Sequence, residues 1–148
     1  MRARRGPRVA TGAAVIRIAA GVLTLLLLCG GVAAQVIRDP AGALIERVTA
    51  NGDVRDPAGR LVGRFAPDDS FRDAAGRLIL RVEIDGDVRD AAGRLVGRIG
   101  GDGSVRDPAG RLVGRVGPRG DVRDPAGRLI ARSDGVPRAR VAVRVFFN

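Results

Sequence analysis

The feature that most constrains the fold is a tandem repeat with a period of 17 residues. The unit is close to GDVRDPAGRLVGRV, and six copies follow one another without an insertion. Each copy contains a turn that begins with aspartate and ends with glycine; these turn residues are Asp39, Gly42, Asp56, Gly59, Asp73, Gly76, Asp90, Gly93, Asp107, Gly110, Asp124 and Gly127. A repeat this short holds one supersecondary unit, so neighbouring copies must stack to bury their apolar faces.

Each copy predicts a β-hairpin. In residues 56–59, DPAG, the proline presets φ and the glycine supplies the positive φ that follows a type I turn with a bulge. Asn51 and Gly52 mark a second turn, for which this dipeptide favours type I′. Glycine and proline thus recur where a helix would need continuity. The sequence predicts an all-β domain with short strands.

Strict alternation along the second strand of a copy places Leu61, Gly63 and Phe65 on one face, with Arg64 on the other. The leucines are therefore expected to line an apolar centre: Leu44, Leu61, Leu78, Leu95, Leu112 and Leu129. The next inward column is mostly small, which suits strands that approach closely near an axis; it contains Glu46, Gly63, Leu80, Gly97, Gly114 and Ala131.

All 26 basic residues are arginine, and the formal net charge is +10. One arginine column gives candidate contacts to anions or to a charged surface: Arg47, Arg64, Arg81, Arg98, Arg115 and Arg132. A ring of guanidinium groups can hold phosphate and focus a positive field. The alternative is a solvated face whose arginines pair with the turn aspartates.

The tail breaks the repeat. After Arg132 the phase slips, and residues 138–147 predict a longer apolar closing strand. Pairing that strand with Val36 and Ile37 would remove both exposed sheet edges and close a ring. The period alone is also compatible with a solenoid.

The first 34 residues predict a secretory signal peptide, because arginines precede an apolar run at residues 18–29 and small residues follow it. Cleavage after Ala34 would leave a β-repeat domain of residues 35–148 with a net charge of +5, since five arginines and no acids are removed. The protein is then expected to be periplasmic or secreted. Lipidation of Cys29 or an uncleaved signal anchor is the alternative, and either would tether it to a membrane.

The composition excludes most catalytic chemistry. The chain has no His and one Cys, so it lacks a Ser/His/Asp triad, a Cys/His pair and the usual metal ligands. The repeat also makes the turn carboxylates alike, whereas acid–base catalysis needs unlike environments. No enzyme activity, cofactor or metal is expected. Nucleic acid is not an expected partner, because there is no Trp or Tyr to stack on bases.

The tandem GDVRDPAGRLVGRV units and the Phe-containing apolar tail resemble the bacterial beta-flower repeat proteins over residues 36–148. This resemblance implies a shallow ring of radiating hairpins with an apolar centre, usually behind a signal or lipoprotein segment. Six DxAG turns exceed the four or five petals of familiar members. The expected function is a non-catalytic envelope module that contacts anionic envelope components or lipid. A small apolar ligand or a lipid in the ring centre is the alternative, and no protein partner is indicated.

Overall fold

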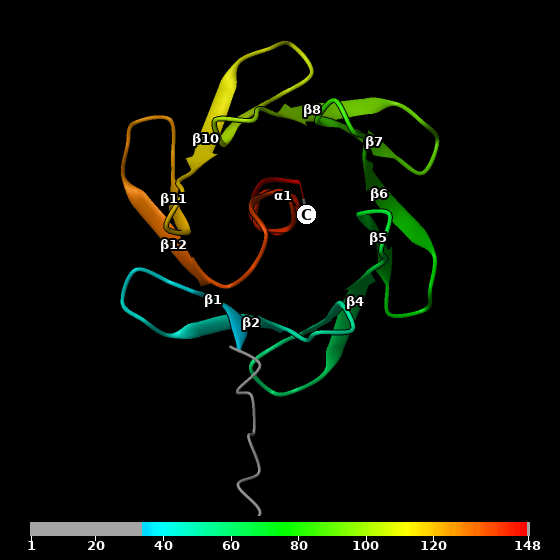
Figure 1. Cartoon of the computed structure of the whole chain (residues 1–148), viewed down its shortest axis with the longest axis vertical. Coiled ribbons are helices and arrows are strands. Elements are labelled where there is room, and N and C mark those ends of the chain that lie inside the picture. The colour runs from blue at the N-terminus through cyan, green and yellow to red at the C-terminus, as the bar shows by residue number, and fades with distance from the viewer. Residues whose placement is uncertain (1–33, 148) are drawn as a thin grey trace, which may run out of the picture.

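A computed structural model describes residues 34–147, which form twelve strands and one helix (Figure 1). The strands are β1 (Gln35–Arg38), β2 (Leu44–Val48), β3 (Asp53–Arg55), β4 (Leu61–Phe65), β5 (Ser70–Asp73), β6 (Leu78–Val82), β7 (Asp87–Asp90), β8 (Leu95–Ile99), β9 (Ser104–Arg106), β10 (Leu112–Val116), β11 (Asp121–Arg123) and β12 (Leu129–Asp134). The predicted signal peptide, residues 1–34, lies outside the described residues except for Ala34.

The strands pair in chain order as an antiparallel closed barrel. Consecutive strands form six hairpins that radiate from the centre, here called petals 1 to 6, with petal 1 made of β1 and β2 and petal 6 of β11 and β12 (Figure 1). The barrel closes where Val36 lies opposite Asp134 and Arg38 lies opposite Arg132. The expected closed ring of hairpins is therefore confirmed, and the solenoid is excluded.

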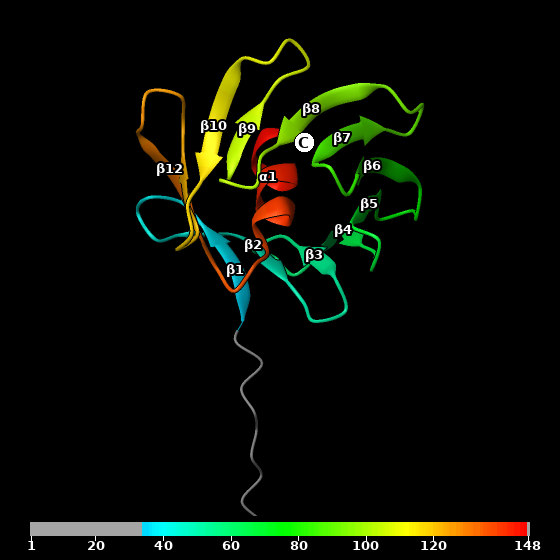
Figure 2. The same ribbon diagram turned by 45° about the horizontal axis from the view of Figure 1, so that its top comes forward.

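The expected closing strand at residues 138–147 is wrong, because helix α1 (Arg138–Phe146) occupies this segment. The helix stands inside the ring (Figures 1 and 2). Once β12 has paired with β1, the closed barrel offers no free strand edge in its interior. A segment buried there must satisfy its backbone N–H and C=O groups within itself, which a helix does. Pro137 directly before the helix is the one local signal of its start.

The core lies between the helix and the ring wall. Val54, Val88 and Val105 of the wall and Val141 and Val143 of the helix are all fully buried. The small inward column also faces this space, as expected.

Glycines in that column leave room for aromatic rings. A Cβ atom at Gly97 would overlap the ring of Phe147, and one at Gly114 would overlap the ring of Phe146. The same Cβ atoms would also lie 2.5 Å and 2.7 Å from backbone oxygens of the neighbouring strands, so these glycines both leave room for the rings and let the strands approach closely, as expected.

The leucine column does not line the centre, which corrects the expectation from strict alternation. In every petal the register shifts by one residue, so that Val54 lies opposite Gly63 while Arg55 lies opposite Leu61. This bulge turns Leu61 to the face that carries Arg55. All six leucines are only half-buried and lie outside the core cluster, whereas Val62 packs against it.

The DPAG turns form the outer ends of the petals, where the glycines take φ between 81° and 91°. At the tip of petal 2 the Asp56 Oδ1 atom accepts the Arg60 backbone N–H at 2.9 Å, and Asp56 Oδ2 accepts the Arg60 side-chain Nε–H at 2.7 Å. The predicted turns are confirmed as structural. The inter-petal turns differ from expectation: Gly52 has a positive φ and Asn51 does not, so this turn is not type I′.

Acid is expected to destabilise the ring through the tip aspartates. In five petals the tip carboxylate accepts a backbone N–H from the arginine that follows the tip, as Asp56 does from Arg60. This bond lowers the pKa of the carboxyl below its ordinary value of 3.8 in Asp56, Asp73, Asp90, Asp107 and Asp124. A carboxyl with a lowered folded-state pKa stabilises the fold above its unfolded-state pKa and loses this contribution as pH falls through its folded-state pKa. The urea midpoint should be constant from about pH 7 to about pH 5 and fall below about pH 4.

The control is a variant with all five tip aspartates replaced by asparagine. The amide oxygen still accepts the backbone N–H but does not titrate, so this variant should lose less stability in acid. An equally steep acid loss in the variant would contradict a role for the tips.

Candidate functional site

Twelve arginines encircle the outer wall of the barrel in six cross-strand pairs, here called the arginine belt. Each pair spans the boundary between two petals, and the pairs are Arg47 with Arg55, Arg64 with Arg72, Arg81 with Arg89, Arg98 with Arg106, Arg115 with Arg123, and Arg132 with Arg38. The predicted contact residues supply one member of every pair. The other member of each pair belongs to a second arginine column with the same 17-residue spacing, and only ring assembly shows that the two columns face each other.

Like charges directly opposite each other destabilise a sheet, so this arrangement needs compensation. One member of each pair is anchored to its own petal tip. In petal 2 the Arg55 Nη1 atom donates to the Gly59 carbonyl oxygen at 3.0 Å, and the equivalent bonds in the other petals measure 2.9 to 3.2 Å. These anchored arginines therefore have a structural role as well as a charge.

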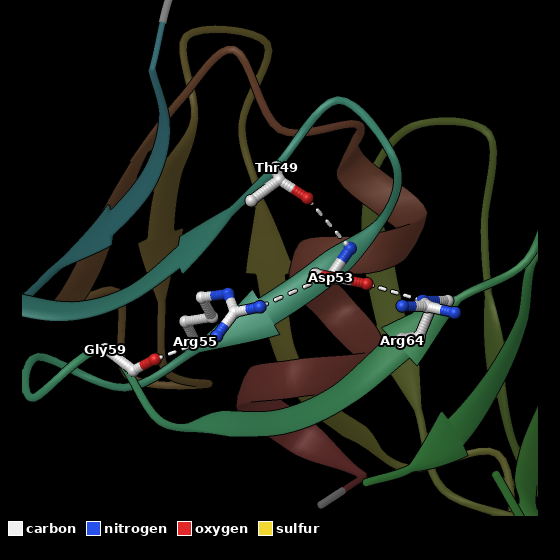
Figure 3. A network of polar contacts seen from close by, with 5 residues as sticks. All are labelled: Thr49, Asp53, Arg55, Gly59 and Arg64. Atoms are coloured by element: carbon white, nitrogen blue, oxygen red, sulfur yellow. Dashed lines mark hydrogen bonds and ion pairs between the residues drawn. The ribbon is translucent and has the colours of Figure 1, made fainter.

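Carboxylates beneath the belt neutralise part of it. In petal 2 the Asp53 carboxylate accepts hydrogen bonds from Arg64 and from Arg55, whose Nη2 atom lies 3.4 Å from Oδ2, while the Asp53 backbone N–H donates to Thr49 (Figure 3). The bond from Arg64 is the largest cause that lowers the pKa of Asp53. Asp87 makes the same contacts with Arg89 and Arg98 in petal 4.

Petals 3 and 5 carry serine where Asp53 stands in petal 2. Ser70 Oγ donates to the Asp68 carboxylate at 2.6 Å, and Ser104 Oγ donates to Asp102 at 2.7 Å. The acid in these petals therefore belongs to the preceding inter-petal turn. Asp102 lies 3.8 Å from Arg115, at the limit of an ion pair.

The belt does not pair with the tip aspartates, contrary to the alternative considered from the sequence. Those aspartates bind the arginine that follows each tip glycine, as Asp107 does with Arg111 at 2.7 Å. Within residues 34–147, six belt arginines have no carboxylate within 4.0 Å: Arg38, Arg47, Arg72, Arg81, Arg106 and Arg132. Arg98 and Arg115 are each 58% exposed. The belt is thus a solvated, incompletely neutralised cationic surface.

The centre of the ring, the second predicted site, is largely filled by α1. A cavity of about 220 Å³ remains between the helix and petals 1 and 6. Ile45, Ile130 and Val145 line it, together with Glu46 and Arg144. This volume is below the roughly 300 Å³ at which most small-molecule pockets begin, whereas a second cavity, of about 460 Å³, lies beside Val82, Ile99 and Ala139 at the start of the helix.

Within residues 34–147, no group of three or more His, Cys, Asp or Glu side chains is placed to hold a metal ion. No helix among these residues has the length and apolar character needed to cross a membrane.

The fold defines a closed ring of β-hairpins with a central helix and a cationic outer wall. The family model of the 5-fold beta-flower protein matches residues 32–148, and the chain belongs to this family. It is not a known enzyme family. The family is named for five-fold symmetry, whereas this ring closes with six petals. No curated protein and no solved structure matches the chain.

Proposed function

We propose that this chain is a non-catalytic, exported protein of the bacterial envelope whose arginine belt contacts anionic lipid headgroups. The observation that carries the proposal is the belt itself. Twelve arginines face outward in pairs, and half of them lack an ion-pair partner within residues 34–147. Arginine binds phosphate oxygens through its planar fork of donors, and each arginine near an anionic membrane is worth about 1 kcal/mol.

The position of the belt supports a membrane as the partner. Arg47 directly precedes Val48 and the inter-petal turn, so this part of the belt lies toward the turn end of the ring. Gln35 pairs with Val48, which places the junction with the N-terminal segment at the same end. Lipidation at Cys29 or an uncleaved anchor would hold that end near the bilayer.

The test is binding to phosphatidylglycerol vesicles at low salt. Replacing Arg81, Arg115 and Arg132 with glutamine is expected to weaken binding at least tenfold, because three charges near the surface are lost. Wild-type binding should also fall at high salt, as exposed charges are screened. Sedimentation with phosphatidylcholine vesicles gives the background.

A matched control removes the same charge from the tips of the same petals. The variant Arg77→Gln, Arg111→Gln and Arg128→Gln should keep most of the binding, because these arginines are already paired with tip aspartates. An absence of binding at low salt, or equal losses in the two triple variants, would rule out the belt as the membrane contact.

The cavity beside Ile45 and Ile130 supports one second candidate, a small apolar ligand or lipid held inside the ring. Native mass spectrometry of the purified protein separates the two functions. A retained small molecule would favour the cavity, and bare protein that still binds anionic vesicles would favour the belt.

A further inference from the structure

Five of the six petal boundaries join petals that follow one another in the sequence. The sixth, between petals 6 and 1, forms only when the ring closes. At this seam Arg132 of β12 lies opposite Arg38 of β1, and Arg47 of β2 lies opposite Val36 on the other side of β1. These three residues, here called the seam triad, share the outer face of three adjacent strands.

Petal 1 differs from the other petals in supplying no carboxylate to the belt. Val36 stands where petals 2, 4 and 6 carry Asp53, Asp87 and Asp121. Petals 3 and 5 replace that aspartate by a serine bonded to a turn aspartate, and petal 1 has no such pair either. Within residues 34–147, no carboxylate lies within 4.0 Å of any seam-triad guanidinium.

Two acids face the seam triad without pairing with it. Asp121 lies opposite Arg132, but its carboxylate lies 3.6 Å from Arg123. Asp134 lies opposite Val36 and is exposed. Asp39 follows Arg38 at the tip of petal 1, where its carboxylate accepts the Ala43 backbone N–H at 2.8 Å. The three guanidinium groups of the seam triad thus outnumber the two acids near them that pair with no arginine within residues 34–147, Asp39 and Asp134.

On the opposite side of the ring, acids in the inter-petal turns offset part of the positive charge of the belt. The three turns that join petals 2 to 5 contain five acids, namely Asp68, Asp69, Glu83, Asp85 and Asp102. The turn at residues 49–52 has no charge, and the turn at residues 117–120 carries Arg119. The two inter-petal turns that flank petals 1 and 6 therefore add no acid to the belt.

We propose that the seam triad is a phosphate-binding site. This inference rests on the proposed contact with lipid headgroups and adds to it one site, at the seam, where a single phosphate group binds most tightly. Directly opposite side chains in an antiparallel pair start about 5 Å apart, and diagonal ones about 7–8 Å apart. Two or three guanidinium groups at these spacings can share the oxygens of one phosphate group. Arg38 is already held by its 3.0 Å bond to the Gly42 carbonyl oxygen, so less side-chain freedom is lost on binding.

The test titrates the full-length protein with inorganic tripolyphosphate at low salt and follows binding by calorimetry. Arg47→Gln with Arg132→Gln should weaken binding at least tenfold. The matched control, Arg81→Gln with Arg98→Gln, removes two arginines of the same column from neighbouring petals across the ring and should weaken it less than threefold. Arg38 is left intact because it holds its petal tip. Thermal melting of both variants checks that the ring remains folded.

Each outcome decides between the seam site and the membrane function. Equal losses in the two double variants, or no binding of tripolyphosphate by the wild-type protein, would overturn the seam site. If vesicles still bind in that case, the belt function stands without a seam site. If the protein binds tripolyphosphate at the seam but does not bind vesicles, the seam site stands and its ligand is a soluble phosphate compound. That result would overturn the membrane function.

Discussion

Replacing Glu46 with glutamine should lower the free energy of unfolding by about 3–5 kcal/mol, the usual cost of removing one partner from a buried ion pair. Glu46 on the ring wall and Arg144 on α1 are each only 9% exposed. Glu46 Oε2 accepts the Arg144 Nε–H at 2.8 Å, and a second bond joins Arg144 Nη2 to Glu46 Oε1. Without the carboxylate the guanidinium stays buried and uncompensated. Urea unfolding at neutral pH measures the effect.

Two controls isolate the buried pair. Asp124→Asn removes a carboxylate that pairs with an arginine 81% exposed and should cost less than about 1 kcal/mol. Replacing both Glu46 and Arg144 with leucine removes both buried charges and should recover most of the stability lost in the single variant. A single-variant cost equal to that of Asp124→Asn would mean that this pair does not hold the helix in the ring.

Adding a methyl group at both Gly97 and Gly114 should destabilise the fold by about 2–6 kcal/mol, from an overpacking cost of about 1–3 kcal/mol at each site. The new Cβ atoms would overlap the rings of Phe147 and Phe146. They would also lie 2.5 Å and 2.7 Å from the backbone oxygens of Arg106 and Arg123, which cannot move without shifting a strand. Urea unfolding gives the cost, and far-ultraviolet circular dichroism shows whether helix is lost.

Gly101 and Gly117 provide the matched control for this double substitution. Both belong to inter-petal turns and lack a positive φ. A Cβ atom at Gly101 meets nothing within 4 Å, and one at Gly117 makes only ordinary contacts at 3.5 Å and beyond. The control double variant to alanine should keep nearly all the stability. Equal losses would show that the small column does not act by leaving room for the phenylalanine rings and the neighbouring strands.

The repeat by itself determined the hairpins and their tips, whereas the number of petals in the ring came from the structure. Asp56, Pro57 and Gly59 specify a turn through local backbone preferences and hydrogen bonds between near neighbours, and such effects do not depend on the rest of the fold. The closed all-β ring was predicted because hairpins must bury their faces on one another and closure removes the exposed edges. The strand expected to close it was wrong, since β12 and not the tail pairs with β1. The arginine column of the candidate site was visible in the same periodicity.

Tertiary structure alone decided what fills the ring and how its charges meet. The alternating segment from Val141 to Val145 fits a strand locally, but a closed barrel has no free edge for it, so the backbone bonds itself as a helix. The bulge in each petal moved Leu61 and its equivalents out of the core. One extra residue in the strand turns the side chains of the residues that precede the bulge to the other face of the sheet. Arg38 and Arg132, 94 residues apart in the chain, face each other because closure joins petal 6 to petal 1.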